Sequence, residues 1–328
     1  MDKTNLKDKR DFRISVAPMM GWTDKHDRYF LRLISPNIWL YTVMITTGAL
    51  IHGDAKSFLD FNEEEHPLAL QLGGSNPEDL GICAKMAEEF NYDEVNLNCG
   101  CPSDRVQRGD FGACLMAQPK LVADGVDAMK QSCDIPVTVK TRIGIDEQDD
   151  YGFVRDFVGT VAEKGCGLFI IHARKAWLHG LSPKENRTVP PLKWDTVYQL
   201  KQDFPDLAIE LNGGVQTIDH INEVAPHTDG VMIGREAYQN PYFLADIERM
   251  FYNNISPLTR HEVIDRLKPY IEQQIAGGVP LKDITRHILG LYQGIRGARH
   301  YRRVLSEQAY KEGKNSELLD LALSNIKL

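Results

Sequence analysis

The sequence lacks long apolar runs, and this absence limits what the chain can be. No stretch of its 328 residues approaches the roughly 20 consecutive apolar residues that a membrane-spanning helix needs. The segment Met1–Arg10 is polar and lacks the apolar core of a signal peptide. We therefore expect a cytoplasmic protein without membrane segments.

Cysteine is also scarce. Six cysteines in a chain of this length are not typical of a disulfide framework, and most are expected to be buried thiols. Cys99 and Cys101 form a Cys-x-Cys pair, but a metal site would need two further ligands at matching spacing, and none is apparent. We expect no metal site.

Acidic residues outnumber basic ones overall but not in the last quarter of the chain. The net charge is −8, whereas residues 246–328 contain 13 Lys/Arg and 10 Asp/Glu, a net charge of +3. The segment Ile284–Ser306 has five arginines, two histidines and no acidic residue. A solvated helix face would explain such a segment. On an acidic protein, however, it also indicates a binding site for an anion.

Short apolar segments alternate with amphipathic helical segments over the first 250 residues. The predicted strands are Ile14–Met19, Leu40–Ile45, Leu68–Leu72, Glu94–Asn98, Val137–Thr141, Leu168–His172, Ala208–Asn212 and Gly230–Ile233. Predicted helices between them include Pro77–Phe90, Pro119–Ser132, Gly152–Lys164, Trp194–Asp203 and Thr217–Val224. Eight βαβ units in about 240 residues predict an α/β fold, a closed (β/α)8 TIM barrel. An open doubly wound sheet is the alternative, but no G-x-G-x-x-G sequence follows the first strand.

After Tyr252 only helical patterns follow. They cover Arg260–Ala276, Leu281–Arg303 and Ser316–Ile326. We therefore predict a barrel domain over residues 1–250 and a small all-helical C-terminal domain over residues 251–328. Within the barrel, Arg174–Leu192 is a long irregular insertion, and such loops are usually functional or disordered.

Polar residues gather where the predicted strands end, at the rim on which barrel enzymes build their active sites. They include Gln71, Asn98, Cys101, Lys140, Arg142, His172, Asn212 and Arg235. A lone His172 would more often be a structural residue, but a whole set on one rim indicates a ligand, because buried polar groups need partners. The glycines after the last two strands, Gly213, Gly214 and Gly234, are typical of a barrel phosphate site.

Cys101, rather than Cys99, is the candidate reactive thiol. Cys99 extends an apolar strand and is expected to pack, whereas Cys101 lies between Gly100 and Pro102 at the start of a loop over the barrel mouth. A protonated thiol there can donate a proton, and a thiolate could act as a nucleophile. The residues alone leave both roles open.

These motifs resemble those of the tRNA-dihydrouridine synthases, particularly their A-type bacterial branch. The matching segments are Ala17–Met19, Gln71–Gly74, Asn96–Ser103, Val139–Arg142, Ile171–Arg174, Asn212–Gly214 and Met232–Arg235. The match covers nearly the whole chain, and its Gly-Cys-Pro-Ser turn is highly specific. One departure is Cys99, whose position is usually aliphatic in the family.

The resemblance implies FMN as the bound cofactor and NADPH as the electron donor. The implied FMN ligands are Pro18, Met19, Met20, Gln71, Lys140, His172, Asn212, Gly213, Gly214, Gly234 and Arg235. The implied reaction saturates the C5–C6 bond of a uracil: hydride passes from flavin N5 to C6, and Cys101 protonates C5. Lys140 would face the N1/C2 side of the flavin.

The resemblance also implies tRNA as the substrate, with U20 and U20a of the D-loop as the modified positions. The implied tRNA contacts are Asn98, Lys184, Arg187, Arg299 and Arg302. Tyr292 or Tyr301 could stack on a base, and the target uridine must leave its stack to reach the flavin. We expect a monomer without an obligate protein partner.

Two other functions fit part of the sequence. An FMN barrel oxidoreductase acting on a free small molecule, such as a dihydroorotate or dihydropyrimidine dehydrogenase, would explain the rim but not the arginine-rich helical segment. An RNA chaperone or RNA-binding protein with a degenerate barrel would require losses among the rim residues, and we find none.

Overall fold

The structure is a computed structural model that describes residues 12–327, apart from the side chains of residues 104 and 105. The segment Met1–Arg10, on which the expectation about a signal peptide depends, lies outside the described residues. Contacts divide the chain into two units. The first holds the chain up to Met20 together with Trp39–Phe61 and His66–Gly234, and the second holds Gly21–Ile38, Asn62–Glu65 and the chain from Arg235 onward. The proposed domain boundary after residue 250 stays a prediction.

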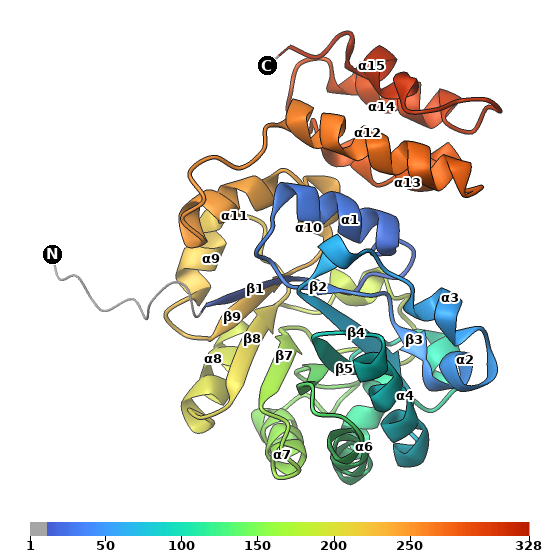
Figure 1. Ribbon diagram of the computed structural model, residues 1–328. Coiled ribbons are helices and arrows are strands. Elements are labelled where there is room, and N and C mark those ends of the chain that lie inside the picture. Colours follow the sequence, from blue (N-terminus) through green and yellow to red (C-terminus); the bar gives the residue numbers. More distant parts are fainter. Residues whose placement is uncertain (1–11, 328) are drawn as a thin grey trace, which may run out of the picture. The chain divides into compact units, whose positions relative to one another are not determined.

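A parallel β-sheet forms the centre of the first unit (Figure 1). Its strands are β1 (Arg13–Val16), β2 (Leu40–Tyr41), β3 (Ile45–Thr46), β4 (Leu68–Gly73), β5 (Glu94–Cys99), β6 (Val137–Arg142), β7 (Leu168–His172), β8 (Ala208–Asn212) and β9 (Gly230–Ile233). Their order is β1-β9-β8-β7-β6-β5-β4-β2, with β3 also paired to β4. Trp39, just before β2, exchanges backbone hydrogen bonds with Ile14 and Val16 of β1, which closes the sheet. The predicted (β/α)8 barrel is confirmed.

One predicted strand is interrupted. Leu40–Ile45 is split into β2 and β3, which pair with different parts of β4. The backbone N–H of Gln71 donates to the hydroxyl of Thr42 rather than to a backbone carbonyl. This side-chain acceptor takes the place of a backbone acceptor between the two short strands.

Helices surround the strands of the first unit (Figure 1). They are α2 (Thr47–His52), α3 (Ala55–Leu59), α4 (Pro77–Glu89), α5 (Asp104–Gln107), α6 (Pro119–Ser132), α7 (Tyr151–Ala162), α8 (Trp194–Asp203) and α9 (Ile218–Val224), with 3-10 turns η3 (Gly112–Ala117) and η4 (Glu185–Arg187). Side-chain caps start several of them: Asn76 caps α4, Asp150 caps α7 and Thr217 caps α9. Every residue of β4 and β5 is buried, as expected for parallel strands covered on both faces.

The second unit is helical. It comprises α1 (Lys25–Ile34), η2 (Glu63–Glu65), α10 (Arg235–Gln239), α11 (Phe243–Phe251), α12 (Arg260–Ala276), α13 (Leu281–Thr285), η5 (Ile288–Gly290), α14 (Ala298–Gln308) and α15 (Glu317–Leu323). No helix within residues 12–327 is long and apolar enough to cross a membrane. The predicted helix α12 has the expected bounds and begins with a capping box of Thr259 and Glu262.

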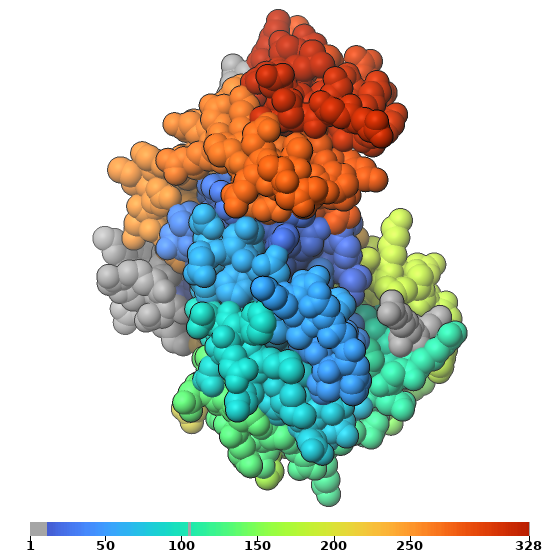
Figure 2. Space-filling view, turned by 45° about the vertical axis from the view of Figure 1, so that its right-hand side comes forward, coloured from blue at the N-terminus to red at the C-terminus, as the bar shows by residue number. Residues whose placement is uncertain are grey.

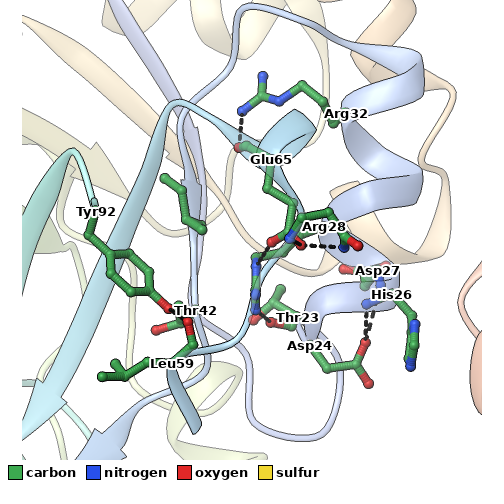
Figure 3. Close-up of polar contacts among 12 residues, drawn as sticks. Thr23, Asp24, His26, Asp27, Arg28, Arg32, Thr42, Leu59, Glu65 and Tyr92 are labelled. Atoms are coloured by element: carbon green, nitrogen blue, oxygen red, sulfur yellow. Dashed lines mark hydrogen bonds and ion pairs between the residues drawn. The ribbon is translucent and has the colours of Figure 1, made fainter. Parts of the chain in front are cut away.

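Helix α1 belongs to the second unit because polar contacts connect it there. Figure 3 shows Arg28 bonded to the carboxylate of Glu65 and Arg32 bonded to the backbone carbonyl of the same residue. Glu248 of α11 accepts hydrogen bonds from Ser35 and Asn37, just after α1. A segment close to the N-terminus is thereby joined to helices more than 200 residues later.

The prediction of one helix over Leu281–Arg303 is wrong. The segment forms α13, η5 and the start of α14, and Gly294 and Gly297 between η5 and α14 have φ of 78° and 98°. A positive φ ends right-handed helical geometry, and glycine adopts it without a steric penalty. The apolar periodicity continues across the two glycines, although the helix does not.

Candidate active site

The polar side chains predicted for the barrel rim lie at the carboxyl ends of neighbouring strands. The strand register pairs Asn98 with Lys140, Arg142 with His172, and His172 with Asn212. Because the strands are parallel, these ends share one rim. The structure therefore brings the residues singled out on β5 to β8 together, while their individual roles stay predictions.

The backbone of the turn that carries Cys101 is held by four hydrogen bonds. Asn98 Oδ1 accepts from the backbone N–H of Gly100 at 3.0 Å and of Cys101 at 2.9 Å. Arg142 Nε donates to the Gly100 carbonyl at 2.7 Å, and Ala113 N–H donates to the Cys101 carbonyl at 2.9 Å. The Cys101 thiol is partly exposed and donates to the Ser103 hydroxyl at 3.6 Å. The Cys101 thiol thus sits on a fixed backbone.

The two cysteines of the pair differ as predicted. Cys99 is fully buried, and burial raises the pKa of its thiol. Cys101 reaches the surface. The loop after Cys101 returns at Gly112, whose φ is 79° and where an added Cβ would lie 2.6 Å from the Cys101 carbonyl oxygen. Only glycine fits this close approach.

Lys140, His172 and Asn212 form a polar, partly unsatisfied site. Lys140 Nζ donates to Asn212 Oδ1 at 2.9 Å, and the Asn212 amide nitrogen donates to the Met232 carbonyl at 2.8 Å. Burial, with a contribution from Arg142, lowers the pKa of Lys140 to about 7. Burial and the same cations also lower the pKa of His172, so its ring is neutral at pH 7.

His172 Nδ1 is buried and has no hydrogen-bond partner among the described residues. A buried ring nitrogen without a partner is costly. A ligand with a complementary polar atom would remove that cost. The site therefore suits a ligand rich in hydrogen-bonding groups and able to carry negative charge.

Of the glycines after β8 and β9, Gly234 leaves open space, because a Cβ added there would meet nothing within 4 Å. Gly213 and Gly214 have φ of 105° and 83°, and Cβ atoms added there would lie 3.3 Å from the His172 ring and 2.5 Å from the Leu192 side chain. Trp194 Nε1 donates to the Gly213 carbonyl at 2.9 Å and fixes the first of these turns. Of the other predicted cofactor ligands, Pro18 and Met19 are partly buried, Met20 is exposed, Gln71 is buried in β4 and Arg235 begins α10.

The insertion Arg174–Leu192 is held by Asn186, which no sequence motif singles out, and by Arg142, which the sequence predicts only as a rim residue. Asn186 is fully buried and donates to the carbonyls of Trp177 and Leu181, while its oxygen accepts from Trp177 N–H at 2.7 Å. Arg142 donates to the carbonyls of Lys175 and Asn186 at 3.0 and 3.2 Å. One guanidinium therefore contacts both the Cys101 turn and the insertion.

The predicted tRNA contacts of the insertion lie on its surface. Lys184 and Arg187, at η4, are both exposed. Residues of this part of the chain form the yellow-green surface at the right of Figure 2. The place of Arg142 at the end of the Val139–Arg142 motif is a sequence signal for this residue. Nothing in the sequence distinguishes Asn186 from other loop asparagines.

In the second unit, α14 presents Arg299 to solvent and holds Arg302 half-buried. Arg302 and Arg286 line a surface depression of about 360 Å³ together with Tyr238, Gln239 and Gln293. The suggestion that Tyr292 or Tyr301 stacks on a base is wrong. Both side chains are fully buried, with ring centroids 4.9 Å apart, so neither ring face is available.

Comparisons with known proteins identify the family of the chain. The family model described as dihydrouridine synthase matches residues 15–327. Proteins named tRNA-dihydrouridine(20/20a) synthase are 58% identical in Shewanella oneidensis, covering 99% of this chain and 98% of the relative, and 60% identical in Vibrio vulnificus, covering 96% and 97%. The protein of that name in Escherichia coli strain K12 is 58% identical over 95% of this chain and 90% of the relative.

Among solved structures, a 2-naphthoyl-CoA reductase complex is similar, with a TM-score of 0.56 and 11% identity over 72% of this chain and 50% of that one. At this identity the likeness concerns the fold alone, and it agrees with the barrel. The family match covers nearly every described residue, including the Cys101 turn and the whole rim. The chain therefore belongs to the dihydrouridine synthase family of oxidoreductases.

Proposed function

We propose that this chain reduces the C5–C6 bond of U20 and U20a in the tRNA D-loop to dihydrouridine, with bound FMN and with NADPH as the electron donor. The observation that carries the proposal is the Cys101 turn, which lies on the same rim as Lys140 and His172 in a chain matched to the family model over residues 15–327. The printed names of the relatives support the two tRNA positions.

The rim residues fit FMN. The unpartnered Nδ1 of His172 and the amine of Lys140 suit the polar edge of a flavin ring. The backbone N–H groups of the turns at Gly213, Gly214 and Gly234 suit its phosphate, and space is open beside Gly234. The remaining proposed ligands are Pro18, Met19, Met20, Gln71, Asn212 and Arg235. These residues would hold FMN, which when bound would supply hydride-transfer chemistry at the rim, with NADPH as the electron donor.

Cys101 supplies the proton that completes the reduction. When C6 of the uracil gains a hydride, negative charge develops at C5 and the adjacent carbonyl, and the thiol transfers its proton to C5. The hydride and the proton together account for the two hydrogens added. Asn98 and Arg142 hold the backbone of the turn, so that the sulfur stays at the barrel mouth.

The tRNA is held by cationic side chains outside the reacting centre. Lys184 and Arg187 on the insertion and Arg299 and Arg302 on α14 would contact phosphate oxygens, and Asn98 would contact the uridine. Arginine suits phosphate because its guanidinium donates two parallel hydrogen bonds. The target uridine must be unstacked from the D-loop before it enters the barrel mouth.

The proposal is tested with unmodified tRNA, NADPH and the purified protein. We expect dihydrouridine at positions 20 and 20a, detected by mass spectrometry of nuclease fragments. Cys101→Ala should retain its flavin absorption but lose about 100-fold or more in rate, the usual contribution of a general acid. Cys99→Val, which changes the buried thiol of the same pair, is the control and should keep its activity. Undiminished turnover by Cys101→Ala would refute the role of the thiol.

A further inference from the structure

A chain of buried hydrogen bonds runs through the barrel interior to the Cys101 turn. Asn98 Nδ2 donates to Gln71 Oε1 at 2.9 Å, and Gln71 Nε2 donates to Asn96 Oδ1 at 2.8 Å. Asn96 Nδ2 donates to the Thr138 hydroxyl at 2.8 Å, and that hydroxyl donates to Glu94 Oε1 at 2.6 Å. All five side chains are buried, and the chain crosses β4, β5 and β6.

The end of this chain at Glu94 is fixed. Arg13 Nη2 donates to Glu94 Oε2 at 2.6 Å, and the Tyr41 hydroxyl donates to Glu94 Oε1 at 2.8 Å. A carboxylate only accepts hydrogen bonds. The Thr138 hydroxyl must therefore direct its single proton toward Glu94, which leaves its oxygen free to accept from Asn96.

The donor and the acceptor of each following hydrogen bond are set by the bond before it. The nitrogen of the Asn96 amide faces Thr138, so its oxygen faces Gln71; the nitrogen of Gln71 then faces Asn96, and its oxygen faces Asn98. The last amide consequently turns its oxygen toward the N–H groups of Gly100 and Cys101. A flipped Asn98 amide would place its NH₂ group against two backbone donors and release the turn.

We propose that Asn96 and Thr138 are positioning residues for Cys101. Because Glu94 only accepts hydrogen bonds, they fix the amide orientations of Gln71 and Asn98. The fixed amide of Asn98 then holds the Cys101 turn. Neither residue lies on the turn itself. The inference rests on the proposed function only where it concerns the rate of dihydrouridine formation, because the orientation of the turn is a property of the folded protein.

The test compares variants in the full-length, flavin-loaded protein. Thr138→Val has nearly the shape of threonine but removes the hydroxyl, whereas Thr138→Ser keeps it. Thr228→Val is the matched control: its hydroxyl is also buried in the barrel unit, and it bonds to the carbonyls of Val224 and Gly230, outside the chain.

We expect Thr138→Val to lower kcat about three- to tenfold, the effect of about one hydrogen bond on an equilibrium between two amide orientations. Thr138→Ser should restore kcat, and flavin content and KM for tRNA report separately on the proposed contacts of Gln71 and Asn98. A residue that only fills the barrel would lower stability to a similar extent in Thr138→Val and Thr228→Val without this selective loss of kcat.

A second measurement does not require the proposed activity. Iodoacetamide should alkylate Cys101 at least about twofold faster in Thr138→Val than in wild type, Thr138→Ser or Thr228→Val, because a released turn exposes its thiol more often. Mass spectrometry of the Cys101 peptide reports this rate. Thr138→Ala gives the same test should the valine variant not fold.

Equal alkylation rates of Cys101 in folded Thr138→Val and Thr228→Val would overturn the inference, and so would an equal kcat in these two variants. If the wild-type protein formed no dihydrouridine, the proposed function would fall, while the alkylation comparison would still decide the role of Thr138.

Discussion

The buried amine of Lys140 shows how one residue connects the active-site rim to stability. Its pKa is lowered to about 7 by burial and by the nearby guanidinium of Arg142. An unfolded lysine has a pKa near 10.5. A ligand that brings negative charge to the rim would stabilise the protonated amine and reverse part of this shift.

Lys140 predicts a pH dependence of stability in the flavin-free protein. Below pH 7 both states bind the proton, and the folded state bears the full cost of a buried charge. Between pH 7 and about 10.5 the unfolded state binds the proton and the folded state does not, so this group makes stability rise with pH. Urea unfolding at pH 6, 7.5 and 9 should show a smaller rise in Lys140→Met than in wild type. The exposed Lys85→Met is the control, and equal slopes in all three proteins would contradict the assignment.

Site positions could be predicted where they coincide with strand ends. Lys140, His172 and Asn212 were located from sequence because each lies at or next to the last residue of a buried apolar segment, and parallel strands bring such ends together. The contacts of Arg142 with four carbonyls and of Asn186 with Trp177 could not be predicted. These contacts depend on how the insertion folds, and hydrophobic periodicity does not predict the conformation of a loop.

At the scale of elements, periodicity predicted the strands better than the C-terminal helices. The bounds of β7, β8 and β9 agree with the sequence because parallel strands buried on both faces leave continuous apolar segments. Leu281–Arg303 was misjudged because its apolar residues keep a helical spacing across a break. Thr42 likewise divides β2 from β3 through a side-chain hydrogen bond that hydrophobicity does not reveal.

At the break before α14, we expect the replacement of two glycines by alanine to lower the free energy of unfolding by different amounts. Gly297 has a positive φ, and an added Cβ would collide with the carbonyl oxygen of Asn325. Gly294 also has a positive φ, but nothing lies within 4 Å of its added Cβ. Gly294→Ala should therefore cost about 1 kcal/mol of unfolding free energy for the backbone alone, and Gly297→Ala about 1–3 kcal/mol more because the chain must shift. Urea denaturation of both variants checks this order. A greater loss of unfolding free energy in Gly294→Ala than in Gly297→Ala would contradict it.

The insertion should open when its buried asparagine is replaced. Asn186→Ala removes three hydrogen bonds to Trp177 and Leu181, so the loop should expose its backbone more often. Trypsin cleaves after lysine and arginine, and Lys184 and Arg187 flank this position. We expect several-fold faster cleavage there, followed by mass spectrometry of the fragments. Val189→Ala, a change to an exposed side chain of the same insertion, should be cleaved at the wild-type rate; equal rates for both variants would mean that Asn186 does not hold the loop.

At the scale of the whole molecule, charge is divided unevenly along the chain. A net charge of −8 repels a polyanion at long range, yet the acid-free segment Ile284–Ser306 lies within the last 83 residues, whose net charge is +3. On the proposed function, binding of tRNA would depend on short-range contacts by a few arginines against an unfavourable overall charge. Salt acts on these two effects in opposite directions, so the dependence of affinity on salt identifies which side chains contact phosphate.

Replacing both Arg299 and Arg302 by alanine should weaken tRNA binding and flatten its salt dependence. Each phosphate contact contributes about 0.7–0.9 to the slope of log affinity against log salt, so the double variant should lose about 1.4–1.8. Filter binding between 50 and 300 mM salt (roughly the range over which such slopes are measured) gives the slope. Arg155→Ala is the control, because this exposed arginine of α7 pairs with Asp156. A weaker affinity with an unchanged slope would mean that α14 does not contact the phosphates, since the loss of a phosphate contact must release fewer counterions.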